Sequence, residues 1–227
     1  MKRIWLDEVS GSSCELRDDA HHYVKTVLRS REGDIFGILT PEKFCTAKIT
    51  QITNKFTVLE IVEECPVKKP DYRLSVYQCV LKREYMDFAV EKYAELGVTE
   101  ITPVISARSM KDVKDKSFNR YHDIAVKAVL QSENQHVPII NPPVELADIT
   151  ADHEEKLFFY ERKEGKEPVK LKGKNAAIII GCEGGFEEEE AEILKSKGFR
   201  VVSPFKPVLK AETAAVVFTG LVRMELE

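Results

Sequence analysis

Residues 178–190 read IIIGCEGGFEEEE and join an apolar run to a glycine-rich turn and an acidic segment. The three isoleucines follow two alanines, so this run has no polar side, which is typical of a parallel strand covered on both faces. The four glutamates at 187–190 stand where the dipole of a new helix favours negative charge. The stretch therefore predicts a buried strand, a tight turn and a helix, as in an α/β sheet.

The same alternation extends over residues 71–227. Apolar and β-branched runs predict strands at 73–80, 101–105, 156–161, 176–180 and 199–203. Helical spacing of apolar residues predicts helices at 82–96, 117–132, 187–197 and 211–226, with Gly97 and Gly198 ending the first and third. Strands that alternate with helices indicate a mostly parallel sheet.

The first 70 residues follow a different pattern. Short strand-like runs and turns dominate, with one helix expected over 18–30 and an apolar stripe of Val24, Val27 and Leu28. Several short strands with one helix favour a small β-barrel. Two prolines and two lysines in CPVKKPDY (65–72) are typical of a linker, so we place a domain boundary near residue 70.

Composition excludes several classes of protein. The 227 residues carry a net charge of −4, which gives no support for nucleic-acid binding outside a local patch. The five cysteines include no CxxC pair, so a disulfide framework or a zinc site is not expected. No apolar run is long enough to span a membrane, and the N-terminus does not resemble a secretory signal. We therefore expect a cytoplasmic protein without metal or membrane contact.

Two segments follow strands at the carboxyl edge of the predicted sheet, where α/β proteins bind ligands. The first is the turn with Gly181, Gly184 and Gly185, which tolerate positive φ and close approach of a ligand. An ordinary βα turn explains this segment equally well. A phosphate fits poorly beside Glu183 and the four acids after it, so a cationic or neutral ligand is favoured.

The second segment is SPFKPVLKAETAA (203–215), a proline-marked loop that leads into the last helix. Lys210 and Glu212 stand at its mouth, and Glu212 and Thr213 are able to satisfy free helix amides. A capped, buried C-terminal helix is the alternative interpretation.

Four motifs in this order together resemble the 16S ribosomal RNA uridine N3-methyltransferase family of the SPOUT class. They are HHYVKTVLRSREGD (21–34), KREYMDFAVEKYAELGV (82–98), IGCEGGFEEEE (180–190) and LKAETAA (209–215). The similarity covers nearly the whole chain. It departs from the family where Cys182 replaces proline, where Lys210 replaces arginine, and at Pro204, Phe205, Lys206 and Pro207, where the family reads leucine, glycine, any residue, arginine.

The resemblance implies a fold and a ligand. It implies a PUA-like, RNA-binding barrel over 1–70 and a SPOUT methyltransferase domain over 71–227, with a trefoil knot that binds S-adenosylmethionine, in a homodimer. The residues it assigns to the methyl donor are Tyr160, Gly181, Cys182, Glu183, Gly184, Gly185, Leu209 and Thr213. By position, Tyr160 and Glu161 form the first knot loop.

The implied reaction is methyl transfer to N3 of a uridine in 16S ribosomal RNA, free or in the small subunit. Lys210 is the candidate cation for the uridine anion, and Glu212 is a base, an orienting group or a helix cap. Alternatives are a non-catalytic ribosome assembly factor of the same fold, or a SPOUT enzyme with another RNA target. For RNA contact the best patch is Lys25, Arg29 and Arg31, although a solvated basic face is also common.

Overall fold

The computed structural model describes residues 1–110, 116–160 and 168–227. The chain divides into two compact units, one of Met1–Lys69 with Leu130–His136 and one of Pro70–Val129 with Val137–Glu227. The sequence gives no signal that Leu130–His136 groups with the first unit. Among the described residues, no helix combines the length and apolar character that a membrane span requires.

The first unit contains a five-stranded sheet in the order β1-β3-β4-β5-β2. Its strands are β1 (Arg3–Trp5), β2 (Ser13–Leu16), β3 (Ile35–Leu39), β4 (Lys43–Ile52) and β5 (Thr57–Pro66). β1 runs parallel to β3, and the remaining pairs are antiparallel. A core cluster that includes Val24, Phe36 and Ile49 packs inside this unit.

The predicted first helix is shorter and less regular than its spacing suggests. It consists of α1 (Asp18–His22) and a π-helical turn, η1 (Tyr23–Val27). A π-turn holds more residues per turn than an α-helix, so it rotates the expected stripe. Val24 is fully buried, whereas Val27 is exposed, and the predicted stripe is therefore wrong at Val27.

The second unit is an α/β fold with a parallel sheet, as the alternation predicted. The sheet has the order β12-β10-β11-β6-β7-β8, and β9 also pairs with β7. Its strands are β6 (Arg73–Cys79), β7 (Glu100–Ile105), β8 (Ile139–Ile140), β9 (Val144–Glu145), β10 (Glu155–Phe159), β11 (Asn175–Ile180) and β12 (Arg200–Val202). All the pairs are parallel.

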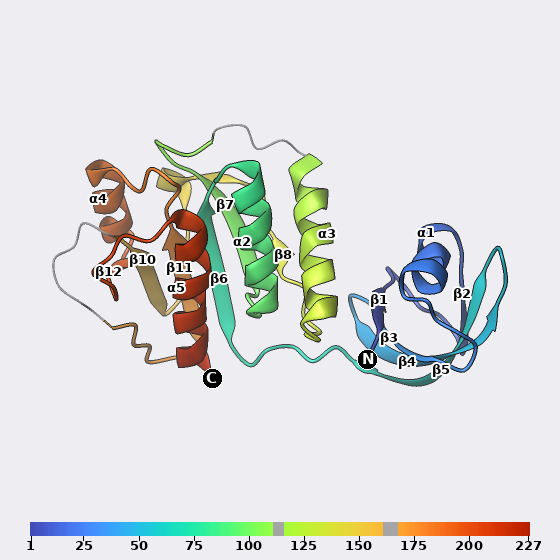
Figure 1. The fold of residues 1–227 in the computed structure, drawn as a ribbon. Helices are drawn as coiled ribbons and strands as arrows, with labels where there is room; N and C mark the ends of the chain where they lie inside the picture. Colours follow the sequence, from blue (N-terminus) through green and yellow to red (C-terminus); the bar gives the residue numbers. More distant parts are fainter. Residues whose placement is uncertain (111–115, 161–167) are drawn as a thin grey trace. The chain divides into compact units, whose positions relative to one another are not determined.

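The helices of this part of the chain are α2 (Arg83–Glu95), α3 (Lys116–Gln131), the 3-10 turn η2 (Leu146–Asp148), α4 (Glu188–Ser196) and α5 (Ala211–Leu226). In Figure 1, α2 and α5 lie side by side in front of the sheet, and the two helices are in contact. Gly97 and Gly198 end α2 and α4 with positive φ, as predicted.

β11 occupies the centre of the second unit. It lies between β6 and β10, and Ala176–Ile180 are buried on both faces of the sheet. The strand ends at Ile180, and only seven residues, 181–187, separate it from α4, whose N-cap is Glu187. Glu187 and Glu190 form a capping box, in which each side chain accepts from the other residue's amide. The segment 178–190 is therefore the strand, turn and helix that its sequence predicts.

Candidate functional site

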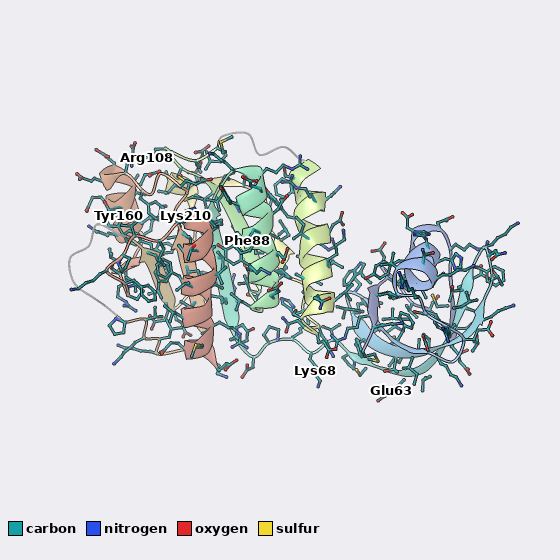
Figure 2. The ribbon with its side chains drawn as sticks, in the orientation of Figure 1. Glu63, Lys68, Phe88, Arg108, Tyr160 and Lys210 are labelled. Atoms are coloured by element: carbon teal, nitrogen blue, oxygen red, sulfur yellow. The ribbon has the colours of Figure 1, made fainter. Side chains whose placement is uncertain are left out.

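A cavity of about 390 Å³ opens where β6, β10, β11 and β12 end. This is the carboxyl edge of the parallel sheet, where ligands of α/β folds bind. Most of its wall comes from three segments, the turn 181–186, the loop 202–212 and the end of β10 at Phe159 and Tyr160, and residues of α5 and of the start of α2 complete it. In Figure 2, Tyr160, Lys210 and Arg108 lie toward this same end of the sheet. The two segments that the sequence singled out thus share one cavity.

The turn uses the conformational freedom of its glycines at one position. All three tolerate positive φ, but only Gly185 adopts it, with a φ of 65°. A Cβ on Gly184 would lie 3.0 Å from two carbons of Arg108, and one on Gly181 would lie 3.3 Å from the Phe186 ring. The missing side chains of these two glycines therefore leave room for Arg108 and Phe186 to pack closely against the turn.

Arg108, in the loop after β7, contacts the turn through its side chain. Its guanidinium donates to the Gly184 carbonyl oxygen at 2.9 Å and lies 3.4 Å from the Glu187 carboxylate. Sequence reasoning missed this residue, because the loop after β7 has no glycine or proline signature. The available signal was its position three residues beyond the end of β7, at the carboxyl edge of the sheet.

Gln78 of β6 contacts the start of the turn from within the sheet. Its amide nitrogen lies 2.8 Å from the Cys79 carbonyl, 3.4 Å from that of Ile180 and 3.3 Å from that of Gly181. The Tyr93 hydroxyl of α2 donates to the Gln78 amide oxygen, which fixes the direction of the amide. Burial raises the pKa of Tyr93 well above its ordinary value, so this hydroxyl stays a donor.

Both side chains of this pair are fully buried. Buried polar groups are costly unless they are paired, and here each one has a partner. Sequence reasoning assigned Gln78 no role. A glutamine inside the apolar run RLSVYQCV was the available signal.

Cys182 closes the turn. Its thiol is buried and donates to the Gly185 carbonyl oxygen at 3.8 Å. Burial raises the pKa of the neighbouring Cys79 thiol, so that thiol is protonated at neutral pH. Both cysteines are free. Among the described residues, no cluster of three or more histidine, cysteine or acidic side chains is arranged to hold a metal ion.

Carboxylates and a cation lie at the mouth of the cavity. Glu183 is exposed, and its carboxylate accepts from the Lys82 amide at 3.0 Å. Lys210 is the N-cap residue of α5, and its side chain is 81% exposed. The Lys210 ammonium lies 4.0 Å from the Glu212 carboxylate, which is mostly buried. A cavity with acidic groups at its mouth suits a ligand that carries positive charge.

The predicted ligand-binding residues divide into two groups. Those that line the cavity are Tyr160, Gly181, Cys182, Glu183, Gly184, Gly185, Leu209, Lys210 and Glu212. Thr213 is exposed and is not among the described residues that line it, because the first turn of α5 directs it elsewhere. Glu161 lies outside the described residues.

The predicted RNA patch lies in the first unit. Lys25, Arg29 and Arg31 line one shallow hollow of about 570 Å³. Lys25 donates to the Thr53 carbonyl at 2.8 Å and to the Asn54 side chain at 2.9 Å, so part of its hydrogen-bonding capacity is used within the protein. Arg29 follows the π-turn with a φ of 49°.

Comparison with known proteins identifies relatives over nearly the full chain. The profile of the RNA methyltransferase domain matches residues 68–223. The ribosomal RNA small subunit methyltransferase E of Aquifex aeolicus is 30% identical over 227 residues, which cover 97% of this chain and 98% of that protein.

Two solved structures have the same fold and carry a ligand. One is a putative methyltransferase from Legionella pneumophila with bound SAM, 27% identical, with a TM-score of 0.86 and coverage of 98% of this chain and 97% of that one. The other is the ribosomal RNA small subunit methyltransferase E of Neisseria gonorrhoeae bound to S-adenosyl methionine. It is 26% identical, with a TM-score of 0.86 and coverage of 96% and 95%.

Proposed function

This chain belongs to the RNA methyltransferase family that includes the ribosomal RNA small subunit methyltransferases E, and we propose that it methylates N3 of a uridine in 16S ribosomal RNA with S-adenosylmethionine as donor. The observation that carries the proposal is the cavity, because the turn 181–186 and the loop 202–212 meet there. Two relatives of the same fold are described with this donor bound.

The chemistry of the cavity fits the donor. S-adenosylmethionine combines a sulfonium cation with a flat purine and a polar amino-acid group. The cavity offers the carboxylates of Glu183 and Glu212, apolar walls from Phe159 and Leu209, and backbone groups of the glycine turn. Its volume of about 390 Å³ falls within the usual range for small-ligand sites. The residues that hold the donor in this proposal are Tyr160, Gly181, Cys182, Glu183, Gly184, Gly185 and Leu209.

The bound donor supplies an electrophilic methyl group, and the chain's own residues prepare the uridine. N3 must lose its proton before it can accept a methyl group, so negative charge develops on the base. Lys210 is placed to stabilise that charge, because its ammonium is exposed at the cavity mouth. Glu212 is placed to accept the proton or to orient Lys210, since its carboxylate lies 4.0 Å from the ammonium. Most of the remaining rate enhancement comes from positioning.

We also propose a trefoil knot in the second unit and a PUA-like, RNA-binding barrel in the first. The insertion of β11 between β6 and β10 supports the knot, because the chain passes β10 before it returns to the centre of the sheet. The five-stranded sheet and the hollow lined by Lys25, Arg29 and Arg31 support the RNA-binding unit. Replacing all three by glutamine should lower RNA affinity and flatten its dependence on salt.

The active form in this proposal is a homodimer in the cytoplasm. One side of α5 supports the dimer: Val217 and Leu221 are partly exposed, and Met224 is 74% exposed. These residues are spaced i, i+4 and i+7, so they form one apolar stripe that a second copy of the chain would cover.

Titration calorimetry with S-adenosylmethionine tests the donor, and absence of binding would contradict the proposed function. Mass mapping of ribosomal RNA from a deletion strain then identifies the target. We expect one uridine that lacks its methyl group in the deletion strain and regains it on complementation. A protein that binds RNA but transfers no methyl group would instead be an assembly factor, and a methyl group on another RNA would indicate a different target.

A further inference from the structure

An aromatic side chain stands exposed at the rim of the cavity. Phe205 belongs to the loop between β12 and α5, and 39% of it is exposed although it also lines the cavity. Prolines at 204 and 207 flank it and fix their own φ angles, which limits the motion of the loop. The Ser203 hydroxyl donates to the Phe205 carbonyl at 3.5 Å. The ring is therefore presented by a restrained loop.

Two further rings, the buried Phe159 and the partly exposed Phe218, continue from Phe205 into the protein. Phe159 at the end of β10 stacks on Phe218 of α5, with centroids 3.8 Å apart and planes at 4°. Phe205 continues this stack above Phe218, at 6.2 Å and 25°. The stack begins at the buried Phe159 and ends at Phe205, which is the most exposed of the three rings. An aromatic ring that is braced on one side and open on the other is suited to accept another flat ring.

Lysine side chains share the loop or the cavity with this ring. Lys82, Lys206 and Lys210 are exposed, and all but Lys206 line the same cavity. An aromatic platform beside flexible ammonium groups is the arrangement that proteins use for unpaired nucleic acid, where bases stack and phosphates meet cations. A purely apolar partner would gain nothing from these charges.

We propose that Phe205 is a stacking platform for a nucleobase of the RNA substrate at the entrance of the cavity. The inference rests on the proposed function, in which a uridine must leave its stack or pair to react. It adds a specificity-determining residue to the uridine site. The adenine of the methyl donor offers the same kind of ring. We assign the platform to RNA because Phe205 is exposed on the same loop as Lys206 and Lys210, where phosphates beside a stacked base would meet ammonium groups.

Substitutions at Phe205 test the assignment. Phe205→Leu keeps apolar bulk but removes the aromatic face, and Phe205→Tyr keeps that face. The matched control is Phe88→Leu, which removes a ring with the same exposed fraction of 39% from α2. We expect Phe205→Leu to raise the KM for RNA on the order of 10-fold, the usual scale for one stacked base. Phe205→Tyr and Phe88→Leu should keep the wild-type KM, and the Kd for S-adenosylmethionine should stay unchanged in all three variants.

Two results would overturn the inference. One is a Phe205→Leu variant whose RNA affinity falls no further than that of Phe88→Leu. The other is a parallel rise in the Kd for S-adenosylmethionine, which would assign the ring to the donor. Direct binding of a fluorescein-labelled, uridine-containing RNA measures the same contrast without turnover. If the wild type binds this RNA but transfers no methyl group, the proposed function fails while the platform is still tested; a wild type that binds no RNA rules the platform out.

Discussion

Removing the Tyr93 hydroxyl tests how the glycine turn is held. Tyr93→Phe keeps the ring but leaves the Gln78 amide oxygen buried without its donor. An unsatisfied buried acceptor costs about 1–3 kcal/mol. For a chain of this size each kcal/mol shifts Tm by about 2–4 °C, so we expect Tm to fall by about 2–12 °C.

The same change should weaken donor binding. The amide nitrogen of Gln78 contacts the carbonyls of Ile180 and Gly181, and Tyr93 fixes its direction. Once the amide is free to turn, the carbonyls of the turn lose part of this support. Loss of one net hydrogen bond corresponds to about a 2- to 10-fold rise in the Kd for S-adenosylmethionine.

Tyr77→Phe is the matched control. Tyr77 precedes Gln78 in β6 and faces the other side of the sheet, where its hydroxyl donates to the Thr150 carbonyl at 3.4 Å. Scanning calorimetry and titration with S-adenosylmethionine on both variants separate the two effects. The control should lose some stability and keep its donor affinity. The reasoning is refuted if Tyr93→Phe melts and binds like wild type, or if both variants weaken donor binding equally.

Four other outcomes follow from the same structure. Gly184→Ala places a Cβ 3.0 Å from Arg108, so it should weaken donor binding, and combining it with Arg108→Ala should be less than additive in titration calorimetry. Lys210→Ala should bind the donor normally but lower kcat by about 10²–10³-fold in a methyl-transfer assay; unchanged turnover would remove Lys210 from the mechanism. Burial lowers the pKa of His153 below its ordinary value of 6.5, so the unfolded state takes the proton first, and stability should fall as pH drops below 6.5. Urea titrations at several pH values should show that the free energy of unfolding of His153→Gln falls less steeply below pH 6.5 than that of the wild type. Met224→Glu should shift the molar mass in light scattering from dimer to monomer.

Much of the second unit is predictable because its strands are covered on both faces. A run such as 176–180 has no polar side, and the helices between the strands carry clear apolar spacing, so the α/β alternation matches the structure. The helix at 82–96 is confirmed to within one residue at each end. Local patterns fail where backbone geometry changes. The π-turn at Tyr23–Val27 has no apolar signature, and the expected stripe therefore misplaces Val27.

The site is predictable only in part. Its two loops follow strands at one edge of the sheet, and that rule alone places Gly181 and Lys210 together. The groups that fix the turn are separated from it in sequence by about 75 residues or more, as with Arg108 and Gln78. Such long-range contacts leave no spacing pattern in the chain. Thr213 does not line the cavity for a local reason, since one residue along a helix changes the side that a side chain faces.

Methyl transfer by the purified protein tests the central claim most directly. Small-subunit particles from a deletion strain are incubated with S-adenosylmethionine, and the RNA is digested and analysed by mass spectrometry. We predict one new methyl group per particle, located on N3 of a single 16S ribosomal RNA uridine. No transfer, or transfer to another base or another position of the ring, would contradict the account.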